Sequence, residues 1–164
     1  MASINYILRY FAHKYPYKSE LSKTRITKMI YLADWKSTQK FGSQITDIVW
    51  YFDQYGPHAD NVYSTALKDK KLMIQHERTV YGYPKDVIII KKTGQSDRLG
   101  FEFLTVNELE VLNEVIEDTK HLNLSEFIDY VFDTFPLKNE SKNKVLNLVK
   151  LAELENTTQK TILK

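Results

Sequence analysis

Two consecutive helix starts in the second half of the chain carry complete capping signatures. Thr105 is followed three residues later by Glu108, and Asn123 by Glu126. In each pair the first side chain can accept a hydrogen bond from the first helical turn, while the glutamate accepts one from the capping residue's backbone N–H. Two helices are therefore predicted between residues 105 and 133. Their expected buried residues are Leu109, Leu112 and Ile116 in the first, and Leu124, Phe127, Ile128 and Val131 in the second.

Further helices are predicted wherever apolar residues recur with a period of about 3.6 residues. The first begins near Ile4 and stops before Pro16. The second is capped by Ser19 or Ser22 and ends at Gly42. A third is expected to begin at Pro57, because the missing N–H of proline costs nothing in a first helical turn. The last helix is expected from about residue 141 to 154 with Val145, Leu148, Val149 and Ala152 buried, and the polar residues after 155 are expected to fray.

One β-hairpin is predicted among these helices. Its arms are residues 73–80 and 86–92, and its tip is residues 81–85. The second arm is apolar on both faces and should be covered on both. A short strand is expected at residues 48–52, and a polar loop at 93–100. The fold class is thus α+β and predominantly helical, with a hairpin or small antiparallel sheet. Helices followed by a hairpin are also the parts of a winged helix.

Length and composition indicate one domain. The chain has 164 residues, 43% of them hydrophobic and 27% charged, enough for a single core. We expect residues 1–155 to form that domain and residues 156–164 a polar tail. The chain has no cysteine, which fits the reducing cytoplasm. No apolar stretch reaches the roughly 20 residues that a membrane span requires.

Motifs for cofactors, metals and common hydrolytic chemistry are missing from the sequence. There is no phosphate-binding glycine loop, no GxSxG and no HExxH, and no two of the four histidines have metal-ligand spacing. We therefore expect neither a cofactor nor a metal. His58 with Asp53 and Asp60 is an acid–base candidate. A hydrogen-bonded histidine at a helix start is the more common arrangement, and it is the interpretation favoured here.

Charge is distributed in two poles although the formal net charge is only +2. Residues 1–40 hold eight Lys or Arg against two acidic residues, and residues 101–134 hold nine acidic residues against one lysine. Such poles can pair internally, attract a charged partner or keep the surface hydrated. Lys23, Arg25 and Lys28 stand about one turn apart and could contact phosphates. The small net charge and the acidic segment disfavour a sequence-specific DNA-binding protein.

The stretch from Trp50 to Leu67, WYFDQYGPHADNVYSTAL, crowds aromatic residues around a Gly-Pro turn. In one interpretation Trp50, Phe52, Tyr55 and Tyr63 fill a core beneath the turn. In the other, alternate strand positions face solvent and form a tyrosine-rich surface for a protein partner. Both can hold at once, because a strand presents one set of side chains to each face. The predicted partner-binding residues are Tyr51, Asp53, Tyr55, His58 and Asn61.

Two blocks within Leu21–Ile74 resemble the Panacea domain of SocA-like antitoxins. They are ITKMIYLADWKSTQKFG at residues 26–42 and FDQYGPHADNVYSTALKDKKLM at residues 52–73. The first is similar to an apolar helix with a K-hh-Y-h-A-[DQ] pattern, where h is apolar, and the second to a YGP block. Many relatives have Ser or a second Pro soon after YGP and a glycine after the helix, where this chain has His58-Ala59 and Lys71. The matching positions are Lys28, Tyr31, Ala33, Asp34, Tyr55, Gly56, Pro57 and Tyr63.

This resemblance implies a mostly helical domain without catalytic activity that serves as the antidote of a toxin–antitoxin pair. The implied partner is a toxin protein bound directly, and in one branch of the family also a cytoplasmic protease to which the toxin is delivered. Three functions are thus open: a toxin-neutralising protein, a proteolytic adaptor or phage-encoded interaction protein, and a winged-helix-like nucleic-acid regulator. If the corner is structural and its outer face binds the partner, Tyr55→Ala and Pro57→Ala weaken folding, whereas Tyr51→Ala and His58→Ala leave melting unchanged and reduce partner binding.

Overall fold

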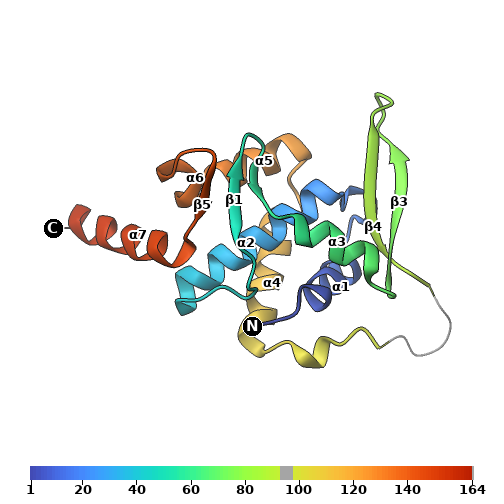
Figure 1. The fold of residues 1–164 in the computed structure, drawn as a ribbon, viewed down its shortest axis with the longest axis horizontal. Helices are drawn as coiled ribbons and strands as arrows, with labels where there is room; N and C mark the ends of the chain where they lie inside the picture. Colours follow the sequence, from blue (N-terminus) through green and yellow to red (C-terminus); the bar gives the residue numbers. More distant parts are fainter. Residues whose placement is uncertain (93–97, 164) are drawn as a thin grey trace.

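The structure is a computed structural model that describes residues 1–92 and 98–163. Part of the predicted loop at 93–100 lies outside these residues. Helices and strands alternate irregularly along the chain (Figure 1). The α-helices are α1 (Ile4–Lys14), α2 (Lys23–Phe41), α3 (Asp60–Lys68), α4 (Val106–Thr119), α5 (Leu124–Phe132), α6 (Phe135–Asn139) and α7 (Leu148–Ile162). The short 3-10 helices are η1 (Lys18–Glu20) and η2 (Phe101–Phe103), and the strands are β1 (Trp50–Asp53), β2 (Gly56–His58), β3 (Leu72–Arg78), β4 (Pro84–Ile90) and β5 (Lys144–Leu146).

Helix α2 runs through the middle of the molecule, and most other elements are arranged around it (Figure 1). Its start is capped by Ser22, whose hydroxyl accepts a hydrogen bond from the backbone N–H of Arg25 at 3.1 Å. It ends at Gly42 in the left-handed conformation. Thirteen of its nineteen residues are buried, so this helix is enclosed on most sides and includes polar residues in its buried part.

The strands form two separate antiparallel sheets. In the first, β1 lies in the centre, with β2 on one side and β5 on the other. The register places Phe52 opposite Pro57 of β2, and Trp50 opposite Leu146 of β5. The second sheet is the hairpin β3–β4, which stands at the opposite side of the molecule from α7 (Figure 1). The predicted α+β class with predominant helix is thus confirmed.

The two predicted capping boxes are present at α4 and α5. Glu108 and Glu126 each donate a backbone N–H to the preceding capping residue and accept one from it. Helix α4 packs along α2, where Lys36 pairs with Asp118 at 2.8 Å and Lys40 pairs with Glu114. The basic and acidic poles of the sequence are therefore partly neutralised by contacts between these two helices.

Several predicted boundaries were wrong. Residues 144–146 form strand β5, so Val145 lies on a strand and is exposed, and α7 runs from Leu148 to Ile162 through the segment expected to fray. Pro57 lies within β2, and the following helix begins at Asp60. In both cases pairing with β1 holds the residues extended: β5 pairs with it from almost a hundred residues away, whereas β2 pairs with it directly across the Gly-Pro turn. The predicted strand at 48–52 gave no indication of which segments would pair with it. Leu124, expected in the core, is half exposed in the first turn of α5.

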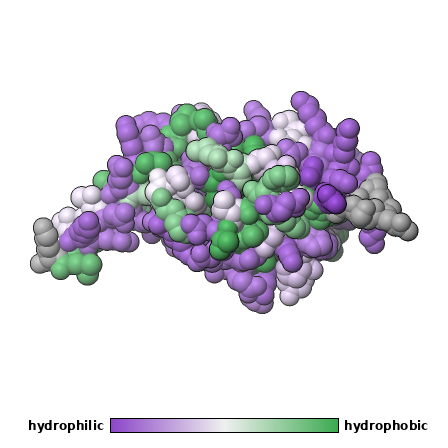
Figure 2. Space-filling model, turned by 90° about the horizontal axis from the view of Figure 1, so that it is seen from below, coloured by the Kyte–Doolittle hydropathy of each residue, from purple (hydrophilic) through white to green (hydrophobic). Residues whose placement is uncertain are grey.

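The hairpin is confirmed with its tip displaced by two residues to 79–83. Val87 and Ile88 are buried, and the isoleucines that follow are only partly covered, so burial of the second arm is incomplete. The surface seen from below is mainly hydrophilic, with hydrophobic residues gathered in patches toward its middle (Figure 2). None of the described helices has the length and apolar character needed to cross a membrane.

Candidate functional site

The carboxylate of Asp34 anchors the segment that leads from α2 into β1. Its two oxygens accept five hydrogen bonds from backbone and side-chain donors, and the residue is fully buried. The backbone N–H groups of Ile45 and Thr46 donate to one oxygen at 2.9 Å each, and the Trp50 indole Nε1 donates to the other at 2.8 Å. Burial raises the Asp34 pKa to about 6, and these hydrogen bonds partly oppose the rise.

The aromatic residues of β1 that point inward extend this anchor into a packed corner. Tyr31 meets Trp50 edge to face with ring centroids 5.7 Å apart, and Phe52 meets Phe132 of α5 similarly at 6.1 Å. The hydroxyl groups of Tyr31 and Thr134 share a hydrogen bond of 2.8 Å. Ala33, also a predicted motif residue, is buried on α2. The interpretation of the cluster as core is therefore confirmed for Trp50 and Phe52.

The turn between β1 and β2 requires glycine at position 56. Gly56 has φ +108°, a conformation that residues with a side chain rarely adopt. A Cβ at this position would lie 3.3 Å from Cε2 of Phe132 and 3.5 Å from Cε of Lys28. The Gly-Pro turn thus brings its backbone directly against α5 and the Lys28 side chain.

A pocket of about 510 Å3 opens beside this turn, between the first half of α2, the start of α3 and the end of α5. Its size is that of an ordinary ligand site. It is lined by Lys23, Thr24, Thr27, Lys28, Asp53, Gln54, Tyr55, His58, Ala59, Asp60, Tyr63, Ile128 and Phe132. The predicted partner-binding residues Asp53, Tyr55 and His58 therefore line the same cavity as the motif residues Lys28 and Tyr63.

Lys28 is the buried cation of this pocket, with only 6% of its surface exposed. Burial lowers its pKa, and the negative charge of Asp53 partly offsets that effect. Lys23, one turn earlier on α2, holds its ammonium 4.1 Å from the centre of the Tyr63 ring. The pocket thus contains two cations: Lys23, which lies over the Tyr63 ring, and Lys28, which is buried.

His58 is held between two carboxylates at the mouth of the pocket. Its Nε2 lies 2.7 Å from Asp60, and its Nδ1 lies 4.0 Å from Asp53. Asp53 also accepts a hydrogen bond from the backbone N–H of Tyr55 at 2.7 Å. This is the arrangement of a histidine fixed near a helix start, as the favoured interpretation expected.

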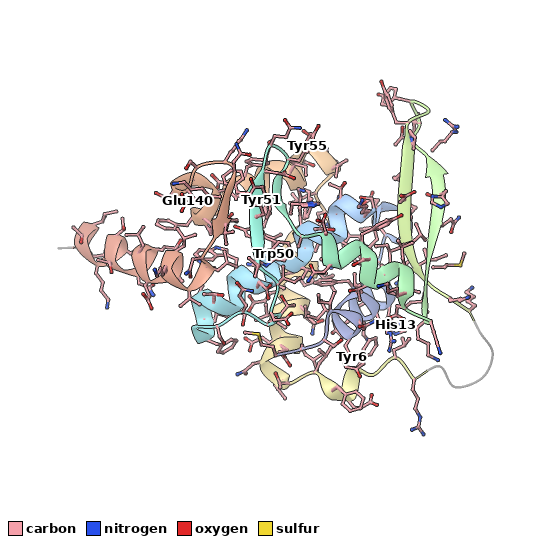
Figure 3. The ribbon with its side chains drawn as sticks, in the orientation of Figure 1. Tyr6, His13, Trp50, Tyr51, Tyr55 and Glu140 are labelled. Atoms are coloured by element: carbon pink, nitrogen blue, oxygen red, sulfur yellow. The ribbon has the colours of Figure 1, made fainter. Side chains whose placement is uncertain are left out.

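Tyr51 and Asn61 are exposed but do not line the pocket. Tyr51 lies farther along β1, whereas Tyr55 sits at the β1–β2 turn (Figure 3). With 70% of its surface exposed, Tyr55 cannot be part of the core as one interpretation held, and the prediction that its removal weakens folding loses its basis. Tyr63 is half buried between pocket and hairpin.

Arg25 corrects the expectation that three basic residues of α2 form a phosphate-binding row. It is 1% exposed, and its Nη2 donates to the carbonyl oxygens of Thr119 at 2.9 Å and Leu122 at 2.6 Å. Its guanidinium also lies 4.7 Å from the ring centre of Phe127. Because Arg25 and Lys28 are both buried, the row cannot meet a nucleic-acid backbone.

No group of three metal-binding side chains occurs within residues 1–92 and 98–163. Sequence reasoning missed the contribution of α5 to the pocket, namely Ile128 and Phe132. Ile128 was correctly placed on the inner face of its helix, but nothing local indicates that this face ends at a cavity. Lys28 was selected only through the family resemblance, although a lysine amid Ile26, Met29 and Ile30 on one helix is itself a signal of an enclosed cation.

Comparison with protein families gives one decisive result. Residues 26–135 match the model of the antitoxin SocA-like Panacea domain. The chain belongs to this family. The matched Panacea segment includes α2 from Ile26 onward, the β1–β2 corner, the hairpin and both capping-box helices, and so nearly all of the pocket. No curated protein and no solved structure matches the chain.

Proposed function

We propose that this Panacea-domain chain is a non-catalytic antitoxin that neutralises a toxin protein by binding it directly in the cytoplasm. The observation that carries the proposal is the family match over residues 26–135. The absence of cysteine from the sequence is consistent with a reducing compartment. We further take the chain from α1 to the end of α7 as one domain, because α1 and α7, which lie outside the match, both pack against α2.

The proposed contact surface is the mouth of the pocket with the adjoining face of β1. Tyr55 and His58 supply the exposed aromatic and polar groups that protein interfaces favour, and Asp53 supplies charge. Tyr51 and Asn61 extend the surface beyond the pocket. The family positions Asp34, Gly56 and Pro57 support it from below by fixing the β1–β2 corner.

Co-expression with the adjacent gene tests the proposal. We expect growth arrest caused by the neighbour to be relieved and the two proteins to co-purify in a fixed ratio. Tyr55→Ala should weaken the complex, whereas Tyr83→Ala, which removes an equally exposed tyrosine from the hairpin tip, should not. Arrest without rescue and without a complex would contradict the antitoxin assignment. Rescue accompanied by protease-dependent loss of the toxin would instead indicate an adaptor.

A further inference from the structure

Lys28 makes no hydrogen bond and no ion pair with any residue that the structure describes. Asp53 attracts the Lys28 ammonium only electrostatically. One of its oxygens accepts the hydrogen bond from the Tyr55 backbone, and the other lies near His58. The Lys28 ammonium is largely enclosed and reaches solvent only through the cavity, and a poorly hydrated ammonium without a hydrogen-bonded partner in the protein is energetically unfavourable. The cavity in front of Lys28 is therefore a place where an added anion gains a partner that the protein itself does not supply.

The other walls of the pocket specify what kind of anion fits. Phe132, Ile128 and Ala59 form an apolar wall, and the Tyr63 ring is already covered by Lys23. Two lysines and two aspartates line the cavity, so its formal charge is balanced before a ligand enters. A singly charged group matches one free ammonium, whereas a doubly charged phosphate would meet the carboxylates of Asp53 and Asp60 with excess negative charge.

We propose that this pocket binds a carboxylate carried on an apolar group, with Lys28 as the ion-pairing residue. Given the proposed antitoxin function, this carboxylate belongs to an acidic residue that lies beside an apolar one on the surface of the toxin. Charge-assisted hydrogen bonds between ammonium and carboxylate are stronger than neutral ones, and the enclosed position of Lys28 screens the pair from water. The acidic side chain thus provides specificity, and its apolar neighbour fills the space toward α5.

The first test uses the isolated full chain and two small probes. The labelled protein is titrated with 3-phenylpropionate and, separately, with the neutral 3-phenylpropionamide, while the NMR signals of Lys28, Gly56 and Phe132 are followed. We expect saturable shifts at these residues with the acid and binding at least about tenfold weaker with the amide, the discrimination expected of one charge-assisted hydrogen bond.

Matched variants separate the pocket lysine from general charge. Lys28→Met keeps the length of the side chain and should abolish the preference for the acid. Lys68→Met removes the same charge from the exposed far end of α3 and should leave the preference unchanged. Equal binding of acid and amide, shifts located elsewhere, or an unchanged preference in Lys28→Met would overturn the carboxylate site.

The toxin provides the second test and keeps the two proposals separable. Lys28→Met should lower affinity for the toxin about tenfold or more, while Lys68→Met should not. Full neutralisation by Lys28→Met would overturn this inference and leave the antitoxin function standing. Carboxylate selectivity in a protein that neutralises no neighbour would refute the antitoxin function and assign the site to a free carboxylate ligand instead of a toxin side chain.

Discussion

The Trp50 indole donates a hydrogen bond to the buried Asp34 carboxylate at 2.8 Å, and this bond joins the central helix to the first strand of the corner that carries the pocket. Asp34 also collects the Ile45 and Thr46 backbone N–H groups. One carboxylate thus determines where residues 44–50 run and, through them, where β1 begins. The family-motif aspartate is in this structure a residue that positions the site without lining the pocket.

Asp34→Asn should destabilise the protein by about 3 kcal/mol, the range observed when a buried charged hydrogen-bond network is broken. The amide NH2 would replace an oxygen that accepts from Thr46 and Trp50, and donors would then face donors. Urea unfolding measures the loss. Asp129→Asn, an exposed position on α5, serves as the control and should stay within about 0.5 kcal/mol of the wild type.

Titration of Asp34 should be visible near neutral pH. Its folded pKa of about 6 lies above the value of 3.8 for an unperturbed aspartate. The folded state therefore binds the proton more tightly than the unfolded state, and the stability linked to Asp34 is full below pH 3.8 and is lost as the pH rises through 6. Carbon NMR of the carboxyl group should give a midpoint near 6. A midpoint below 4 would show that the five hydrogen bonds outweigh burial.

Gly56→Ala should cost more stability than Gly82→Ala. Both glycines have positive φ, but an added Cβ at position 56 would lie a tight 3.3 Å from Phe132, whereas one at position 82 would meet nothing within 4 Å. We expect about 1 kcal/mol for Gly82→Ala from backbone strain alone and about 3 kcal/mol for Gly56→Ala. Thermal unfolding of the two variants distinguishes backbone strain from steric contact with α5. Equal losses of stability would contradict the close approach of the turn to α5.

Lys28→Met should leave the fold intact and raise its stability by about 1 kcal/mol. The substitution removes an ammonium group without a close partner and keeps an apolar stem of similar length against Gly56. Chemical denaturation gives the difference. A loss of more than 1 kcal/mol would mean that Lys28 contributes to folding, and its energetic cost would then not be available for ligand binding.

Tyr55→Ala should not change the melting temperature, because the side chain is 70% exposed at the turn. The variant Phe52→Ala, two strand positions from the turn and fully buried, should lower stability by about 3 kcal/mol. Differential scanning calorimetry compares them. Similar losses in both variants would place Tyr55 in the core after all.

The sequence was sufficient for elements whose signals are local. Thr105, Asn123 and their glutamates determine where α4 and α5 begin, because capping geometry involves only four residues. For the same reason, Ser22 and Gly42 mark the start and the end of α2. Strand β5 could not be anticipated, since Val145 and Leu146 are extended only because β1 offers hydrogen-bond partners almost a hundred residues away in sequence. Local pattern alone favours helix for that segment.

In the candidate site, too, local features were predictable from the sequence and tertiary contacts were not. The turn motif placed Asp53, Tyr55 and His58 near one another, because they are consecutive or nearly so on a tight corner. Their convergence with Lys28 and Phe132 depends on the packing of α2 and α5 against that corner, which no spacing in the sequence encodes. Burial of Arg25 likewise emerged only from its tertiary contacts with the α4–α5 connection.

That connection has a consequence for how a partner is accommodated. Arg25 ties α2 to the carbonyl groups of Thr119 and Leu122, immediately before α5 begins. Helix α5, which contributes Ile128 and Phe132 to the pocket, is therefore held in place relative to α2, which contributes Lys28. Because these helices are joined, the cavity is preorganised, and binding in it would not carry the entropy cost of forming it. In the proposed complex, adjustment to the partner would therefore come from the exposed Tyr55 at the rim, whereas the deep part of the cavity would keep its shape.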